Sequence, residues 1–169
     1  MNTPKFLIVH HEAPPMVITG DRFNIVNEYH KQKWDFKSSL GFYCGYQYFV
    51  ELSGKVIQAR ADNEEGAHTI GKNTESIGIC LANNFDLTLP TQAQIDALTK
   101  LLKEKMIQHN ILVENIVPHR KFANKSCYGK NLPDDWAANL VRETLPTEQL
   151  TTEEISRVRK LLKTFFWIK

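Results

Sequence analysis

The hexapeptide Phe6-Leu7-Ile8-Val9-His10-His11 is the stretch of sequence that decides the fold. Its first four residues are continuously apolar and favour extended backbone, which is typical of a central strand buried on both faces. The strand stops at two adjacent histidines, so side chains capable of chemistry stand at its carboxyl end. In open α/β sheets, ligand sites gather just beyond the carboxyl ends of strands.

Further strands are expected on the C-terminal side of this stretch. The run 44–51 alternates aromatic and polar side chains, and with a return over 56–60 it predicts a β-hairpin. Residues 77–81 are a second buried apolar run. A short strand over 115–117 leads directly into Pro118-His119.

Helices are expected between these strands. Apolar spacing predicts one helix over about 22–33 with Asp21 as its N-cap, and another over about 134–143. Thr91-Gln92-Ala93-Gln94 is a capping box that opens an amphipathic helix ending near His109. Strands interleaved with helices predict an α/β fold, with a mixed central sheet flanked by helices.

The last part of the chain, 147–169, is expected to form an extra helix beyond a main domain of 1–146. Apolar residues recur at helical spacing from Ile155 to Ile168, and basic residues surround them. A basic amphipathic helix can lie on an anionic membrane or wall surface. Surface helices are commonly amphipathic, however, so we expect this one to pack on the domain.

Length and composition exclude several classes of protein. A chain of 169 residues with 42% hydrophobic and 24% charged residues fits one globular domain. The 21 basic and 19 acidic side chains nearly cancel and leave a formal net charge of +2. This charge is too small to indicate nucleic acid as the main partner. No apolar run is long enough to span a bilayer, and no secretory signal is evident. We therefore expect synthesis in the cytoplasm, and we expect a monomer.

Three residues are candidate metal ligands. His10 closes the first strand, His119 closes the last, and Cys127 follows His119 by eight residues in a loop. If the two strands are neighbours, the loop can return the Cys127 thiolate to the histidines. Two nitrogen ligands and one sulfur ligand with a fourth position open describe a catalytic zinc site. Spacing alone leaves open the alternative that the histidines are ordinary hydrogen-bonding groups.

Other side chains that could carry function have plainer explanations. Cys44 and Cys80 lie in aromatic and apolar runs and are expected to be buried free thiols. His30 and His109 fall within helices, where we expect them to be exposed or satisfied by hydrogen bonds. Four aromatic residues could line a sugar-binding groove or pack in the core: Trp34, Phe42, Tyr43 and Tyr48.

Four blocks of sequence occur in an order that carries a family resemblance. They are Val9-His10-His11; Gly45-Tyr46-Gln47-Tyr48-Phe49 with its hairpin to Arg60; Gly66-Ala67-His68-Thr69 with the following Asn73 and Ser76-Ile77-Gly78-Ile79; and Pro118-His119-Arg120 with Lys125 and Cys127. Together they resemble the zinc amidases of the N-acetylmuramoyl-L-alanine amidase type, which include phage lysozyme-like amidases and peptidoglycan recognition proteins. The likeness runs from about residue 5 to residue 143.

The resemblance implies a role for each matching residue. It makes His10, His119 and Cys127 the ligands of a zinc ion (Zn²⁺). Tyr46 would assist catalysis beside the metal, and Lys125 would stabilise the negative charge of the transition state. His68 matches a position near the substrate groove and would bind substrate.

Two details bear on how closely the site follows the family. His11 is the rival of His10 for the first ligand position, but adjacent strand side chains point to opposite faces, and the motif favours His10. Tyr128 stands where the family usually has proline after the cysteine, and Pro118 stands where glycine is common. Both affect the shape of the loop more than the chemistry of the ligands.

The implied function is hydrolysis of the amide bond between N-acetylmuramic acid and L-alanine in peptidoglycan. An endolysin would act on the cell wall after release, whereas a recycling enzyme would act on muropeptides in the cytoplasm. A non-catalytic peptidoglycan-binding module is an alternative, although such modules commonly lack the metal cysteine. A zinc peptidase that cuts within the stem peptide is another.

Overall fold

A mixed sheet of five strands, in the order β3-β2-β4-β1-β5, organises the computed structural model, which describes residues 1–143. β1 (Phe6–His11) lies inside the sheet and pairs in parallel with β4 (Ser76–Leu81) and β5 (Ile116–Pro118). β2 (Tyr48–Val50) is parallel to β4 and antiparallel to β3 (Val56–Gln58). The predicted mixed sheet and its hairpin are confirmed.

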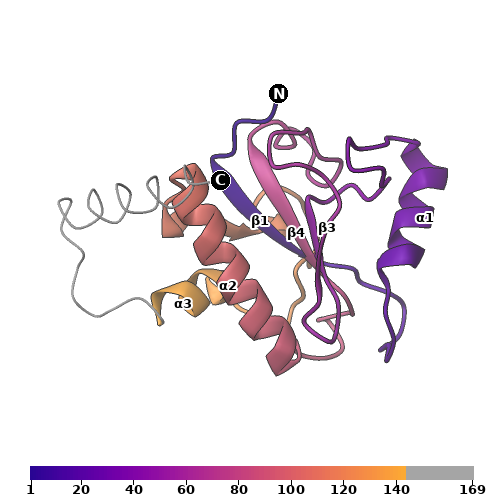
Figure 1. Ribbon diagram of the computed structural model, residues 1–169. Coiled ribbons are helices and arrows are strands. Elements are labelled where there is room, and N and C mark those ends of the chain that lie inside the picture. Colours follow the sequence, from indigo (N-terminus) through magenta and orange to yellow (C-terminus); the bar gives the residue numbers. More distant parts are fainter. Residues whose placement is uncertain (144–169) are drawn as a thin grey trace, which may run out of the picture.

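Helices cover both faces of this sheet (Figure 1). α2 (Gln92–His109) and α3 (Trp136–Arg142) lie on one side, and α1 (Phe23–Trp34) lies on the other. Two short 3-10 helices, η1 (Val113–Asn115) and η2 (His119–Lys121), flank β5. The α/β architecture predicted from the sequence is therefore confirmed as three layers.

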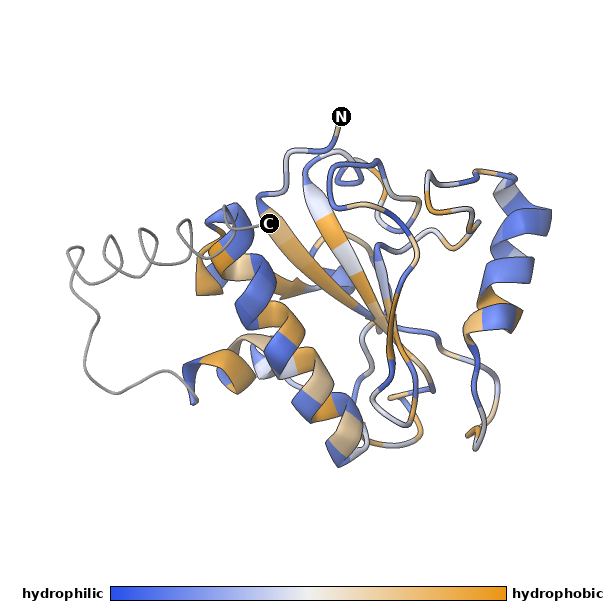
Figure 2. Ribbon diagram, viewed as in Figure 1, coloured by the Kyte–Doolittle hydropathy of each residue, from blue (hydrophilic) through white to orange (hydrophobic). Residues whose placement is uncertain are grey.

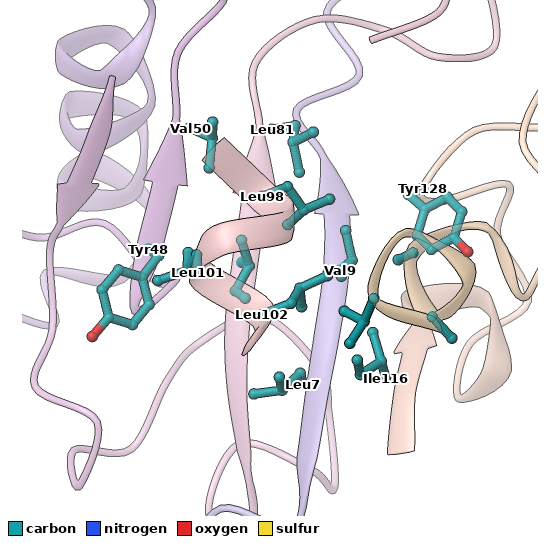
Figure 3. Close-up of a cluster of buried hydrophobic side chains, with 14 of the residues drawn as sticks. Leu7, Val9, Tyr48, Val50, Leu81, Leu98, Leu101, Leu102, Ile116 and Tyr128 are labelled. Carbon is teal, nitrogen blue, oxygen red and sulfur yellow. The ribbon is translucent and has the colours of Figure 1, made fainter. Parts of the chain in front are cut away.

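Two hydrophobic cores hold the layers together. In the larger one, Leu98 and Leu102 of α2 pack with Leu7 and Val9 of β1 (Figure 3). The smaller core lies under α1 and contains Phe23, Val26, Phe49 and both predicted buried free thiols, Cys44 and Cys80. Apolar colour runs along most of β1, as expected for a strand buried on both faces (Figure 2).

The start of α2 follows its local sequence. Thr91 accepts the N–H of Gln94 at 3.1 Å, and the Gln94 side chain accepts the N–H of Thr91 at 3.2 Å. This is the predicted capping box, which satisfies backbone donors that a helix start otherwise leaves unpaired.

The start of α1 differs from the prediction. The helix begins at Phe23, and neither Asp21 nor the N-cap residue Arg22 supplies a side-chain cap. Instead the carboxylate of Glu51, at the end of β2, accepts the N–H of Arg22 at 2.8 Å and the N–H of Phe23 at 2.7 Å. A buried carboxylate from another element thus caps the helix, where negative charge is favourable.

Replacing Glu51 by alanine is expected to lower the free energy of unfolding by about 2–3 kcal/mol, because two N–H groups lose a charged acceptor at a buried position. Glu51→Gln retains one acceptor oxygen and should lose less. Urea unfolding measures both, with Glu28→Ala on the exposed side of α1 as the control. Equal stability of Glu51→Ala and the wild type would contradict the capping role.

The first strand of the hairpin is shorter than predicted. β2 begins at Tyr48 rather than at Cys44, because side chains of α1 take the preceding backbone donors. Asn27 Oδ1 accepts the N–H groups of Tyr43 and Cys44, and His30 Nδ1 accepts the N–H of Gly45 at 2.9 Å. These bonds attach α1 to the segment that leads into the sheet.

No helix within residues 1–143 combines the length and apolar character needed to cross a membrane. The predicted boundary at 146/147 and the predicted helix over 147–169 lie outside the described residues.

Candidate metal centre and groove

The sheet brings the two predicted histidine ligands together. β1 and β5 are parallel neighbours with Val9 opposite Pro118, so His10 and His119 are the next residues at the same edge. Their ring centroids lie 4.5 Å apart. The condition for a shared site, that the strands leading to the two histidines are neighbours, is met. β1 continues to His11, and His119 is the first residue of η2.

Cys127 returns to the histidines through the loop after η2. Its Sγ lies 3.7 Å from His10 Nδ1, and the N–H of His11 donates to the same sulfur at 3.4 Å. The candidate ligand atoms of His10, His119 and Cys127 all lie within 4.8 Å of one another. The structure thus assembles all three predicted ligands in one cluster.

The position of the Cys127 loop depends on Arg120, a residue to which the sequence reasoning gave no separate role. The N–H of Arg120 donates to the Cys127 carbonyl at 2.8 Å. The Arg120 guanidinium donates to the carbonyls of Ser126, Gly129 and Leu132. One side chain therefore binds the loop at three places around the thiol.

The donor set and its burial fit a zinc ion. Imidazole nitrogen and thiolate sulfur are the preferred ligands of Zn²⁺, and three of them leave a coordination position open. Burial lowers the pKa of His10 well below its ordinary value and that of His119 to about 4, and the Lys125 cation acts in the same direction. Both imidazoles are therefore neutral, the form that binds metal. Burial raises the pKa of the Cys127 thiol to about 12, while the His11 N–H and Lys125 oppose that shift.

His11 points away from this cluster. Its Nδ1 accepts the N–H of Phe85 at 2.9 Å, and its ring lies against the Phe85 ring. Alternation along β1 therefore separates the two histidines as predicted, with His10 in the cluster.

A groove of about 1280 Å³ opens over the cluster. Tyr46 and Lys125, the two predicted catalytic residues, line it together with His10 and His119. The Tyr46 ring lies 4.9 Å from the His10 ring, and burial raises the pKa of the Tyr46 hydroxyl, which keeps it protonated.

α1 forms the far wall of the groove through Ile25, Tyr29, His30, Lys33 and Trp34. Of the four aromatic residues considered as groove candidates, Trp34 is among the lining residues. Phe42 and Tyr48 pack in the two cores instead, and Tyr43 lies beneath the ammonium groups of Lys31 and Lys37.

His30 also lines the groove, a role that was not predicted from the sequence. His30 is buried and its ring lies between Trp34 and Tyr46, at centroid distances of 4.6 and 5.6 Å. Both helical histidines were expected to be exposed or satisfied by hydrogen bonds, and the second alternative holds: His30 accepts the N–H of Gly45, and His109 pairs with Asp62 at 2.8 Å.

Acid is expected to destabilise the protein partly through His30. Burial lowers its pKa from 6.5 to about 4, so between these values the unfolded chain binds the proton and the folded chain does not. The stabilising contribution is complete above pH 6.5 and decreases as the pH falls toward 4. His30→Asn keeps an acceptor for the Gly45 N–H without this titration. Urea unfolding with a chelator present measures the free energy of unfolding of both proteins. Between pH 7 and 4.5 this free energy should fall by about 2 kcal/mol less in His30→Asn than in the wild type. An unchanged loss would contradict this assignment.

His68, predicted to lie near the groove, lines it and also touches the metal cluster. Its Nδ1 lies 3.2 Å from His10 Nε2 and 3.1 Å from the Thr69 hydroxyl. Burial lowers the pKa of His68 to about 3, so its ring is neutral.

The chain is similar to known proteins over most of its length. Residues 1–130 match the family described as N-acetylmuramoyl-L-alanine amidase. Peptidoglycan-recognition protein 2 of Holotrichia diomphalia is 30% identical over 103 residues, which cover 59% of this chain and 52% of that protein. The endolysin of Klebsiella phage KP32 is 31% identical over 100 residues, which cover 56% of this chain and 65% of that protein.

A solved structure agrees with these matches. The N-acetylmuramoyl-L-alanine amidase LysC from Clostridium intestinale aligns with a TM-score of 0.66 at 26% identity, covering 78% of this chain and 80% of that one. The chain spans about half the length of the Holotrichia protein. The family match, in contrast, includes every strand of the sheet and all three residues of the metal cluster. This chain therefore belongs to the N-acetylmuramoyl-L-alanine amidase family.

Proposed function

We propose that this protein is a zinc-dependent amidase that hydrolyses the bond between N-acetylmuramic acid and L-alanine in peptidoglycan. The observation that carries the proposal is the cluster of His10, His119 and Cys127 at the base of a groove that Tyr46 and Lys125 also line. Family membership supports the reaction class, and the similar proteins named amidase and endolysin support the substrate.

His10, His119 and Cys127 would hold the zinc ion. When bound, Zn²⁺ lowers the pKa of water and polarises the carbonyl of the bond that is cut. Lys125 would place a fixed cation beside the oxygen that becomes negative when water attacks the carbonyl. Tyr46, held protonated by its burial, would donate a hydrogen bond to the same oxygen or orient the attacking water.

The groove supplies the binding surface for the sugar and peptide. Trp34 offers an aromatic face for a sugar ring, and Lys33 adds a positive charge near it. Among the lining residues within 1–143, the one carboxylate is that of Glu12, which pairs with Arg22 at 2.6 Å. The groove therefore favours a neutral or acidic ligand, as the stem peptide is.

Hydrolysis of purified cell walls tests the proposal. The expected result is release of new L-alanine amino termini, lost with EDTA and restored by zinc. New reducing sugars or D-amino termini would show that a different bond is cut. Wall binding without any hydrolysis would identify a recognition module instead.

On this proposal the protein is made in the cytoplasm and acts on the wall after release, or on muropeptides inside the cell. Activity on intact walls compared with soluble muropeptides separates the two settings. A strong preference for intact walls would favour the endolysin role.

A further inference from the structure

The ring of His68 occupies a space that two glycines leave open. A Cβ added at Gly78 would lie 2.6–2.7 Å from the His68 ring, and one added at Gly66 would lie 2.4 Å from its Cδ2. Asn73 Oδ1 accepts the N–H groups of both His68 and Thr69 at 3.0 and 2.8 Å. The His68 ring is therefore fixed by backbone on both sides, in a turn that is itself held by a side chain.

Neither nitrogen of His68 is available to a ligand in the groove. Nδ1 is within hydrogen-bond distance of His10 Nε2 and of the Thr69 hydroxyl. Nε2 is buried and has no hydrogen-bond partner in the part of the chain that the structure describes. The one nitrogen of His68 that has partners therefore faces His10 and Thr69.

The proton positions follow from this contact. His10 Nδ1 faces Cys127 Sγ at 3.7 Å, so this is the nitrogen that would bind the metal. A neutral imidazole that binds through Nδ1 carries its proton on Nε2. That N–H has two possible acceptors, His68 Nδ1 at 3.2 Å and the Thr69 hydroxyl oxygen at 3.5 Å, and His68 Nδ1 is the nearer. Metal-binding histidines commonly donate their second N–H to an acceptor, and that bond sets tautomer and ring orientation.

We propose that His68 is a positioning residue of the metal centre, which holds His10 in the Nδ1-ligating tautomer through the bond from His10 Nε2–H to His68 Nδ1. This role rests on the proposed zinc site and differs from the substrate contact predicted from the sequence. His68 acts through His10 and increases zinc affinity. The contact is partly buried, so its hydrogen bond is stronger than one in open water.

Zinc affinity of the full chain, measured by competition with a chromogenic chelator, tests the proposal. His68→Phe keeps a ring without an acceptor, and His68→Ala removes both ring and acceptor without steric conflict. Both are expected to weaken zinc binding about 10- to 100-fold. His68→Asn places an amide oxygen near the Nδ1 position and should stay within about threefold of wild type. The matched control is His109→Phe, which removes a histidine outside the groove lining.

Wild-type zinc affinity in both His68→Phe and His68→Ala would overturn the proposal, even if wall hydrolysis were lost. Equal weakening in His68→Asn and His68→Ala would also overturn it, because the acceptor would then be irrelevant. Failure of the proposed function is distinguishable: a wild type that binds zinc but cuts no wall still yields the predicted order of affinities. A wild type that binds no zinc contradicts both proposals.

Discussion

Cys127→Ser is expected to abolish zinc binding and to lower the rate of wall hydrolysis by about a thousandfold or more. The thiolate is the only anionic ligand of the cluster formed with His10 and His119, and a serine hydroxyl stays protonated and binds zinc poorly. Loss of the ion removes several kcal/mol of transition-state stabilisation, and each 1.36 kcal/mol is a factor of ten in rate. Metal analysis and release of L-alanine amino termini measure the two effects.

The control for this variant is Cys44→Ala. Cys44 is also a buried free thiol, but it lies in the core under α1. It should retain one zinc ion and most of the activity, with a modest loss of stability from the small cavity. Stoichiometric zinc and wild-type hydrolysis in Cys127→Ser would contradict the assignment of Cys127 as a ligand.

Lys125→Met is expected to lower kcat about 10²- to 10³-fold while zinc remains bound and KM changes little. An ammonium fixed near the developing negative oxygen stabilises the transition state more than the bound substrate. Lys125 is exposed and lies on the groove, so its replacement should leave the fold intact. Steady-state hydrolysis of a soluble muropeptide, with metal analysis in parallel, separates the loss in kcat from loss of zinc.

Lys121→Met provides the comparison for this variant. Lys121 is also an exposed lysine and lies four residues before Lys125, at the end of η2, but it does not line the groove. Its replacement should leave kcat within about twofold of wild type, as expected for a surface change remote from the reaction. If both variants lost activity equally, the effect would come from general surface charge rather than from a cation at the reacting carbonyl.

Much of the fold could be predicted because its signals are local. The apolar run before His10 identifies a buried strand, and the Thr91/Gln94 capping box gives the start of α2 within one residue. Strand alternation also separates His10 from His11 without any knowledge of the partners of either residue.

The features that sequence reasoning missed arise from contacts between distant segments. Glu51 caps a helix that begins 28 residues earlier, and no local pattern connects the two. Asn27 and His30 take backbone donors that the alternating pattern assigned to a strand. The sequence block containing His68 suggested a groove residue, but its contact with His10 spans 58 residues and depends on the tertiary fold.

The attachment of α1 has a consequence for how new substrate ranges could arise. This helix contributes several groove residues but none of the three metal ligands. Besides the apolar contacts of Phe23 and Val26 in the smaller core, it is joined to the rest of the molecule by hydrogen bonds of Glu51, Asn27 and His30. These three side chains bind backbone N–H groups, which nearly any sequence provides. The wall of the groove and its reactive base are therefore separate parts. A transplant of residues 12–45 from a related amidase, with Tyr46 and Glu51 retained, should transfer preference for a cell-wall type and leave the hydrolytic centre in place.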